Sequence, residues 1–321
     1  MKLSGLRYAV GVGALIVLAG CGGSSSQVGV PVALPQHESA SALLVHGHSW
    51  MAPEARNEDL LYLSNVHAQS VDVYSYPRGT LVGSLTGFGK PRSECSDAAG
   101  DVWIADVGGL DVIEFPHGGT APIVALNTAG PPMGCAVDPV SGDLAVTGGT
   151  NGIVLSVFRH TVRGGWLGPS KFSATNMHGA FCGYDAQGNL FLDEQSGKGA
   201  VRFAELSHHG RVLKAVTLSQ NVVAPGQVQW DGTNLAVGDA GVSPAVIYQF
   251  AMSGGTGTES GSTTLDGTKS VRQFWIQGRT VVAPDPNNGV VDFFSYPAGG
   301  SPSATIAARA YGAAVSLAPD H

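Results

Sequence analysis

Short apolar runs recur along the chain, each about five residues long and most ending in an acidic residue. They occupy residues 61–65, 102–106, 144–148, 190–194, 235–239 and 281–285. Successive runs begin 41, 42, 46, 45 and 46 residues apart. Turns rich in Asp, Asn and Gly precede several runs, at 97–101, 138–143, 185–189 and 231–234. Such residues suit the positive φ of hairpin turns, so each run is predicted to be a β-strand.

A second strand signature follows some of these runs, at residues 72–77, 111–116 and 292–297. Each copy ends in Pro, and a glycine follows at Gly79, Gly118 or Gly299. A repeat of 40 to 50 residues that holds several short strands is typical of a β-propeller blade. The six copies therefore predict an all-β fold, a six-bladed β-propeller of four-stranded blades over residues 57–321.

The two ends of the repeat suggest how the ring closes. The first unit begins at its second strand, near Leu60, and the chain ends with an additional apolar strand at 313–317. We expect this C-terminal strand to serve as the inner strand of the first blade, which removes the open edge of an incomplete ring. An incidental tail strand is the alternative.

Composition narrows the class of protein further. Only 13% of the residues are charged and 46 are glycines, which disfavours a helical bundle. The formal net charge is -7, and the 17 Lys and Arg residues are scattered singly, so nucleic acid is an unlikely partner. Neither a Gly-x-Ser-x-Gly elbow nor a phosphate-binding loop is present, which removes the best signals for serine hydrolase and nucleotide chemistry.

The first twenty residues have the features of a secretory signal. Lys2 and Arg7 precede an apolar run at 8–18, and Leu-Ala-Gly then leads to Cys21. This end resembles the bacterial lipobox. The resemblance implies that residues 1–20 are a lipoprotein signal peptide and that Cys21 carries diacylglycerol and an amide-linked acyl chain such as palmitate. An ordinary signal peptide with an incidental Cys21 is the alternative.

The residue after Cys21 bears on the location of the protein. Gly22 stands where the lipoprotein family's inner-membrane retention signal has Asp, so the resemblance favours an outer-membrane anchor. A Gly-, Ser- and Pro-containing, weakly charged stretch follows to about Pro35. We expect residues 21–56 to form a flexible tether that links the lipidated cysteine to the propeller. The expected location is the bacterial cell envelope, on the periplasmic side or at the cell surface.

The turns and strands together resemble a known group of propellers. Asp-x-x-Gly-Asn/Asp turns before the Val-Trp-Ile-Ala-Asp run at 102–106 and the Leu-Phe-Leu-Asp run at 190–193 resemble those of NHL and gluconolactonase-like propellers, over about residues 57–319. The resemblance implies a six-bladed propeller. Since propellers include hydrolases, lyases and binding modules, it does not imply one function.

Three cysteines besides Cys21 fall on predicted inner strands of successive units. Relative to the following turns, Cys135 and Cys182 occupy the same place, whereas Cys95 is displaced by one residue and faces the opposite way. Cys95 and Cys135 are therefore placed to face each other between neighbouring blades. In an oxidising compartment this predicts a Cys95–Cys135 disulfide and a buried free Cys182. Three buried thiols are the alternative, because neighbouring inner strands can exceed the bridging distance of about 7 Å.

Acidic residues give the main candidates for a catalytic site. Four of the repeated strands end in a carboxylate, and around a ring these side chains could converge on a divalent cation. The alternative is that each accepts backbone N–H groups from the next loop, as a part of the repeat. If the protein is an enzyme, the candidate residues are Glu94, Asp106, Glu194, Asp239 and Asp285.

The sequence favours a non-catalytic propeller lipoprotein that presents a binding surface to an envelope protein or glycan. The alternative is a metal-dependent, lactonase-like hydrolase or lyase. Lactonases of the resembled family carry a Glu-Gly-Pro segment near the start of the first blade, and this chain lacks one. The lyases use histidines in their late blades, whereas no histidine lies between His209 and His321. No cofactor is expected, a divalent cation belongs only to the alternative, and a closed ring is expected to be a monomer.

Overall fold

The computed structural model describes residues 48–174, 177–196, 199 and 201–319, which all belong to the compact unit Ser41–His321. The predicted signal peptide, Cys21 and most of the predicted tether lie outside the described residues. The predicted all-β class is confirmed, since strands dominate and the short 3-10 helix η1 (Pro53–Asn57) is the one helical element of the described part. Within that part, no helix is long and apolar enough to cross a membrane.

The first two sheets contain the N-terminal strands and the last strand of the chain. One sheet has the order β1-β4-β3-β2-β25. Its members are β1 (Trp50–Met51), β2 (Leu60–Asn65), β3 (Ser70–Ser75), β4 (Leu81–Leu85) and β25 (Gly312–Ser316). The next sheet has the order β5-β6-β7-β8. Its members are β5 (Pro91–Ser96), β6 (Val102–Asp106), β7 (Asp111–Phe115) and β8 (Val124–Asn127).

The middle of the chain forms a four-stranded and an eight-stranded sheet. The former consists of β9 (Pro132–Val137), β10 (Leu144–Gly148), β11 (Ile153–His160) and β12 (Trp166–Ser173). The latter holds β13 (Met177–Tyr184), β14 (Leu190–Ser196), β15 (Val201–Leu206), β16 (Lys214–Leu218), β17 (Pro225–Trp230), β18 (Leu235–Asp239), β19 (Ala245–Ser253) and β20 (Thr256–Leu265). Its two runs of four, β13–β16 and β17–β20, are joined by parallel pairing of β16 with β20.

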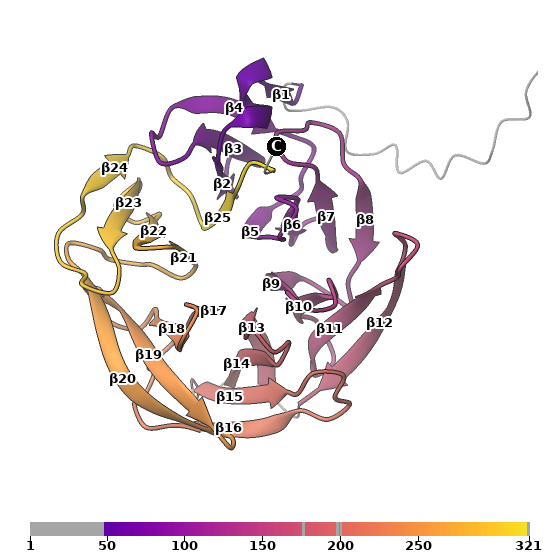
Figure 1. Ribbon diagram of the computed structural model, residues 1–321, viewed down its shortest axis with the longest axis vertical. Helices are drawn as coiled ribbons and strands as arrows, with labels where there is room; N and C mark the ends of the chain where they lie inside the picture. Colours follow the sequence, from indigo (N-terminus) through magenta and orange to yellow (C-terminus); the bar gives the residue numbers. More distant parts are fainter. Residues whose placement is uncertain (1–47, 175–176, 197–198, 200, 320–321) are drawn as a thin grey trace, which may run out of the picture. The chain divides into compact units, whose positions relative to one another are not determined.

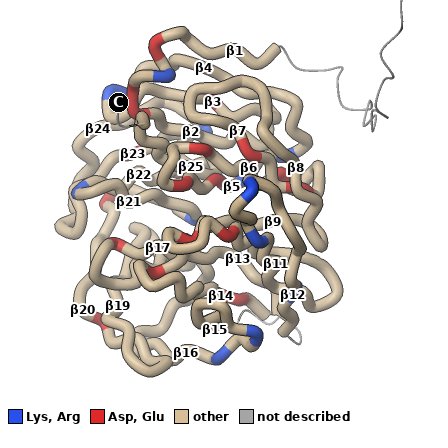
Figure 2. Tube along the Cα trace, turned by 45° about the vertical axis from the view of Figure 1, so that its right-hand side comes forward, with Lys and Arg blue, Asp and Glu red and all other residues tan. Residues whose placement is uncertain are grey.

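The last four-stranded sheet has the order β21-β22-β23-β24. Its strands are β21 (Trp275–Gln277), β22 (Thr280–Asp285), β23 (Val290–Ser295) and β24 (Ala304–Ile306). Figure 1 shows the sheets of this unit arranged around a common axis, with β5, β9, β13, β17, β21 and β25 nearest the centre. Figure 2 shows a trace that is mostly uncharged, with acidic and basic residues scattered over it.

The repeated apolar runs are strands β2, β6, β10, β14, β18 and β22, as predicted. Each lies second from the centre, and nearly all of their residues are buried because both faces of the strand are covered by neighbouring sheets. Between the first two sheets, for example, Tyr62 packs in one cluster with Val102 and Ile104. Continuous apolar runs of this kind therefore supply the core between sheets.

The predicted role of the C-terminal strand is confirmed. β25 pairs antiparallel with β2, and Leu61 lies opposite Val315. The first sheet thus takes its innermost strand from the end of the chain and its other strands from the beginning. This pairing joins the two ends of the chain's folded part in one sheet.

The N-terminal boundary of the folded part differs from the prediction. Residues 48–56 were expected in the tether, but β1 pairs with β4, with Trp50 opposite Ser84. Ala55 of η1 is fully buried in the cluster between the first two sheets. Met51 and Ala52 also pack against this cluster, so apolar contacts and the pairing with β4 hold the segment on the first sheet.

Cys95 and Cys135 are joined by a disulfide bond in the structure, with their Cα atoms 5.7 Å apart. The bond connects β5 to β9 across two neighbouring sheets. Cys182 is free and buried, and burial raises the pKa of its thiol. It packs with Leu190 and Leu192 as a small apolar side chain.

Candidate functional site

The carboxylate of the last residue of β6 accepts hydrogen bonds from backbone amides. Asp106 accepts hydrogen bonds from the amides of Gly89 at 2.6 Å and Lys90 at 2.5 Å, both in the loop that precedes β5. It also accepts the amide of Gly108 at 3.0 Å. The side chain therefore ties the end of its strand to the loop that enters the same sheet.

Two further strand ends repeat this arrangement. Asp239 accepts the amides of Val223 at 2.9 Å, Ala224 at 3.1 Å and Gly241 at 2.9 Å. Asp285 accepts the amide of Lys269 at 2.7 Å and those of two residues in its own turn. These three carboxylates are thus structural groups of the repeat, which is the alternative that the sequence left open.

The other two candidate acids lie in different surroundings. Glu194 borders an outer cavity of about 610 Å³, and burial raises its pKa while nearby Arg202 lowers it to a smaller extent. Glu94 is fully buried on β5, and burial raises its pKa to about 8 although Ser64 opposes the shift. Among the described residues, the five candidate acids do not meet as a group of three metal-ligating side chains.

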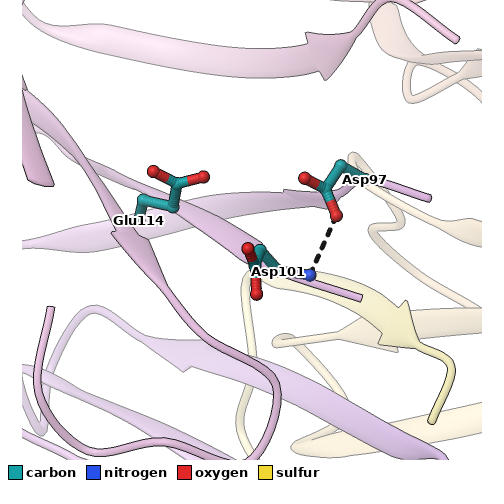
Figure 3. Close-up of side chains that lie close together, drawn as sticks. All are labelled: Asp97, Asp101 and Glu114. Atoms are coloured by element: carbon teal, nitrogen blue, oxygen red, sulfur yellow. Dashed lines mark hydrogen bonds between the residues drawn. The ribbon is translucent and has the colours of Figure 1, made fainter. Parts of the chain in front are cut away.

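Three other acidic residues lie close together just beyond the C-terminal end of β5. Ligand atoms of Asp97, Asp101 and Glu114 all lie within 4.8 Å of one another, and Figure 3 shows these side chains beside the start of β6. The pKa of Glu114 is raised to about 7 by burial and by the charges of Asp101 and Asp97. Carboxylate oxygens are hard ligands, so these three residues could hold a divalent cation.

Hydrogen bonds of Asp97 stabilise the turn between β5 and β6. One oxygen of Asp97 accepts the amides of Ala99 and Asp101, both at 2.9 Å, and so fixes the β5–β6 turn. The sequence identifies Asp97 and Asp101 only as turn residues and does not predict that they lie beside Glu114. The signal that could have found Glu114 is its charge at an interior position of strand β7, between Ile113 and Phe115.

A pair of small cavities lies where the inner strands begin. Two adjoining cavities of about 220 and about 230 Å³ share the lining residues Arg92, Phe181 and Arg272. The first cavity adds Asn287 and Tyr311 to this lining. The second adds His178 and Gln195, among others.

We call the two cavities together the channel mouth. Their lining residues come from or next to the starts of β5, β9, β13 and β17, the ends of β10, β14 and β22, and the loops before β21 and β25. Figure 1 shows β5, β9, β13 and β17 nearest the common axis.

The charged side chains that line the channel mouth are positive. No residue that lines either cavity is acidic, whereas both cavities contain Arg92 and Arg272. Within the described part of the chain, the ion pairs are Arg78–Glu58 and His208–Asp138, so neither arginine of the mouth has a carboxylate partner there. Burial and the charge of Arg272 lower the pKa of Arg92, with a smaller opposing effect from Tyr311.

Glu94 lies on the same strand as Arg92, two residues further from the mouth. Its backbone amide donates to Oε1 of Gln273 at 3.2 Å, and Nε2 of Gln273 donates back to the carbonyl of Glu94 at 2.6 Å. Gly312 leaves room for the carboxyl group, because a Cβ at that position would clash with Glu94 and Gln273. With a pKa of about 8, Glu94 is mostly neutral at pH 7 and does not compensate the arginine charge.

Neither a family model nor a curated protein matches this chain. Solved structures do. The chain is similar to a protein in the crystal structure of a nidogen/laminin complex, at 15% identity and a TM-score of 0.64, covering 82% of this chain and 100% of the other. It is also similar to the β-propeller domain of a protein from Myceliophteria thermophila, at 13% identity, a TM-score of 0.55, and coverage of 81% and 86%.

A third similar structure is a putative 6-phosphogluconolactonase from Bacteroides fragilis, at 13% identity and a TM-score of 0.55, covering 83% of this chain and 86% of the other. The neighbours include β-propellers and lactonase-like proteins, and the chain shares the β-propeller fold. At these identities the likeness concerns the fold alone, since one fold carries many functions.

Proposed function

We propose that this protein is a lipid-anchored, non-catalytic β-propeller of the bacterial outer membrane, which binds a ligand at the channel mouth. The proposed six blades are supported by the sheets: three have four strands, the eight-stranded sheet divides into two runs of four, and the first sheet has four strands plus the short β1. The predicted signal peptide, lipidated Cys21 and tether would hold this ring at the membrane. A glycan or an envelope protein that carries the bound group is the proposed partner.

One observation carries the binding role. The carboxylates at the ends of β6, β18 and β22, which a metal enzyme of this architecture could use, already accept backbone amides. The channel mouth, in contrast, holds two arginines without a carboxylate partner among the described residues. Hydrogen-bond donors in a concave site can orient and recognise a ligand.

The alternative is a metal-dependent hydrolase or lyase. One of the similar structures is called a putative 6-phosphogluconolactonase, and Asp97, Asp101 and Glu114 could hold a divalent cation. However, Arg92 and Asp97 stand at opposite ends of β5, so that acidic group does not share a cavity with the channel mouth. A metal there would more simply stabilise the β5–β6 turn.

The binding role is tested with full-length protein extracted from bacterial membranes in detergent. The protein is incubated with Mg²⁺, Ca²⁺, Mn²⁺ or Zn²⁺ and a panel of lactones, with and without chelator. We expect no metal-dependent turnover of any lactone. Chelator-sensitive hydrolysis that is lost in the variant Asp101→Asn or Glu114→Gln would establish the enzyme instead.

Anchoring is tested separately by the variant Cys21→Ala. We expect the wild-type protein to sediment with outer membranes and its N-terminal peptide to carry the mass of the lipid, whereas the variant lacks that mass. Wild-type protein with an unmodified Cys21 would contradict the lipoprotein assignment and leave the binding role unaffected.

A further inference from the structure

We propose that the channel mouth binds a small organic oxyanion, a carboxylate or a phosphate monoester, between the guanidinium groups of Arg92 and Arg272. This inference names the ligand class of the site and rests on the proposed binding function. It is carried by three properties of the mouth: like charges without a carboxylate partner among the described residues, backbone positions that bring both arginines to it, and small cavities with mixed lining.

Two positive charges lie near each other at the mouth. Arg92 is half-buried, and the charge of Arg272 is one of the two effects that lower its pKa. Arg272 is exposed, so the cost falls mainly on Arg92, which loses part of its hydration and lies near a second positive charge without a counter-ion. A bound oxyanion removes this cost and accepts the guanidinium hydrogen bonds in the two-pronged geometry that arginine offers.

The backbone brings both arginines to the mouth. Arg92 is the additional residue of a β-bulge, since Pro91 pairs with Asp106 whereas Ser93 pairs with Ala105. Arg272 lies in the loop before β21, and its carbonyl accepts the amide of Gln227 at 2.7 Å. The two arginines therefore reach the mouth from a strand of one sheet and from a loop that leads into another.

The remaining lining limits the size and character of the ligand. Cavities of about 220 and about 230 Å³ admit a compact molecule and exclude a folded polymer. Tyr311, Asn287 and Gln195 offer polar groups for hydroxyls, and Phe181 offers an apolar surface. The net charge of -7 further opposes polyanions, which must approach over an acidic protein. A sugar acid or a sugar phosphate fits this description.

The test measures binding of defined probes to the full-length protein by isothermal titration calorimetry. The probes are gluconate, glucose 6-phosphate and inorganic phosphate, with glucose as the neutral control. We expect at least one organic anion to bind with a Kd below about 1 mM and glucose to show no binding at that concentration. Comparison of gluconate with glucose 6-phosphate decides between carboxylate and phosphate as the preferred group.

Substitutions of the two arginines test whether the anion binds at the channel mouth. Arg92→Gln and Arg272→Gln are each expected to weaken anion binding by about tenfold or more, and Arg272→Lys to retain part of it. Arg279→Gln is the matched control, because Arg279 is exposed and lies outside the mouth lining while the net charge changes equally. Arg272 is also exposed, so its substitution tests the site even if Arg92→Gln impairs folding.

The inference is overturned if none of the anions binds at about 10 mM, or if the arginine variants bind like the wild type. That result leaves the proposed binding of a larger partner standing. If an anion binds through the arginines and is chemically converted, the ligand class is supported and the non-catalytic role fails.

Discussion

His117 and Ser316 join the second sheet to the closing strand of the ring. Nδ1 of His117 lies 2.6 Å from the hydroxyl oxygen of Ser316, which belongs to β25. The Nε2–H of His117 donates to the carbonyl of Glu58 at 3.0 Å, ahead of β2. One imidazole thus contacts both the first and the last part of the closed sheet, and both ring nitrogens of its neutral form have partners.

This arrangement predicts a pH-dependent stability. Burial lowers the pKa of His117, so the unfolded chain binds a proton more readily than the folded one. Stability contributed by the neutral imidazole is therefore present above the ordinary pKa of about 6.5 and is lost as the pH falls through it. We expect the Tm difference between wild type and His117→Gln to shrink between about pH 8 and pH 5. A difference that stays constant over this range would refute the assignment.

The disulfide is expected to contribute strongly to stability. Cys95 and Cys135 are 40 residues apart in the sequence, and closing a loop of that length corresponds to about 4 kcal/mol in the chain-entropy description. The double variant Cys95→Ala/Cys135→Ala is expected to lose about 2–5 kcal/mol in urea unfolding.

Thiol labelling provides the control for this prediction. In urea without reductant, an alkylating reagent should modify Cys182 and leave Cys95 and Cys135 unmodified. Modification of all three would show that the bond does not form in the isolated protein.

The strand-end carboxylates are expected to stabilise the fold and not to bind metal. Asp239→Ala leaves the amides of Val223 and Ala224 without their acceptor. The expected cost is about 1–3 kcal/mol of unfolding free energy. Exposed Asp266 is the matched control, and Asp266→Ala should change stability little. Normal stability of Asp239→Ala together with a loss of bound metal would instead identify Asp239 as a ligand.

Glu94 is expected to lower stability at alkaline pH. Its folded pKa of about 8 lies above the ordinary 4.5, so the folded chain binds the extra proton between these values and stability falls as the pH rises. Each pKa unit corresponds to about 1.4 kcal/mol. Glu94→Gln keeps the shape without the charge, and its stability relative to wild type should rise between about pH 5 and pH 9. Parallel pH profiles of wild type and variant would disprove the raised pKa.

The strands and ring closure could be predicted because each strand has a signal within a short stretch of the sequence. Apolar runs of five residues, several of them preceded by an Asp- and Gly- or Asn-containing turn, indicate the strands and their ends, and their regular spacing indicates the repeat. The disulfide partners also followed from a local quantity, the offset of Cys95 from the turn. Strand β1 escaped prediction because Trp50 and Met51 are too few to form a pattern.

The channel mouth could not be predicted, because Arg92 on β5 and Arg272 in the loop before β21 are far apart in the sequence and neither belongs to a motif. Their meeting depends on where the ring places the start of β5 and the segment before β21. The strand-end acids presented the opposite difficulty: Asp106, Asp239 and Asp285 form a visible pattern, but the pattern follows from backbone hydrogen bonds common to the repeat. The bulge at Arg92 also belongs to the repeat, because similar register shifts occur near the start of β9, β13 and β17.

The most direct test of the account is native mass spectrometry of the full-length protein after incubation with gluconate or glucose 6-phosphate. The account predicts that wild-type protein retains one unmodified anion, that Arg279→Gln does the same, and that Arg92→Gln/Arg272→Gln retains none. An adduct of equal abundance in the double variant, or conversion of the anion into a product of different mass, would contradict it.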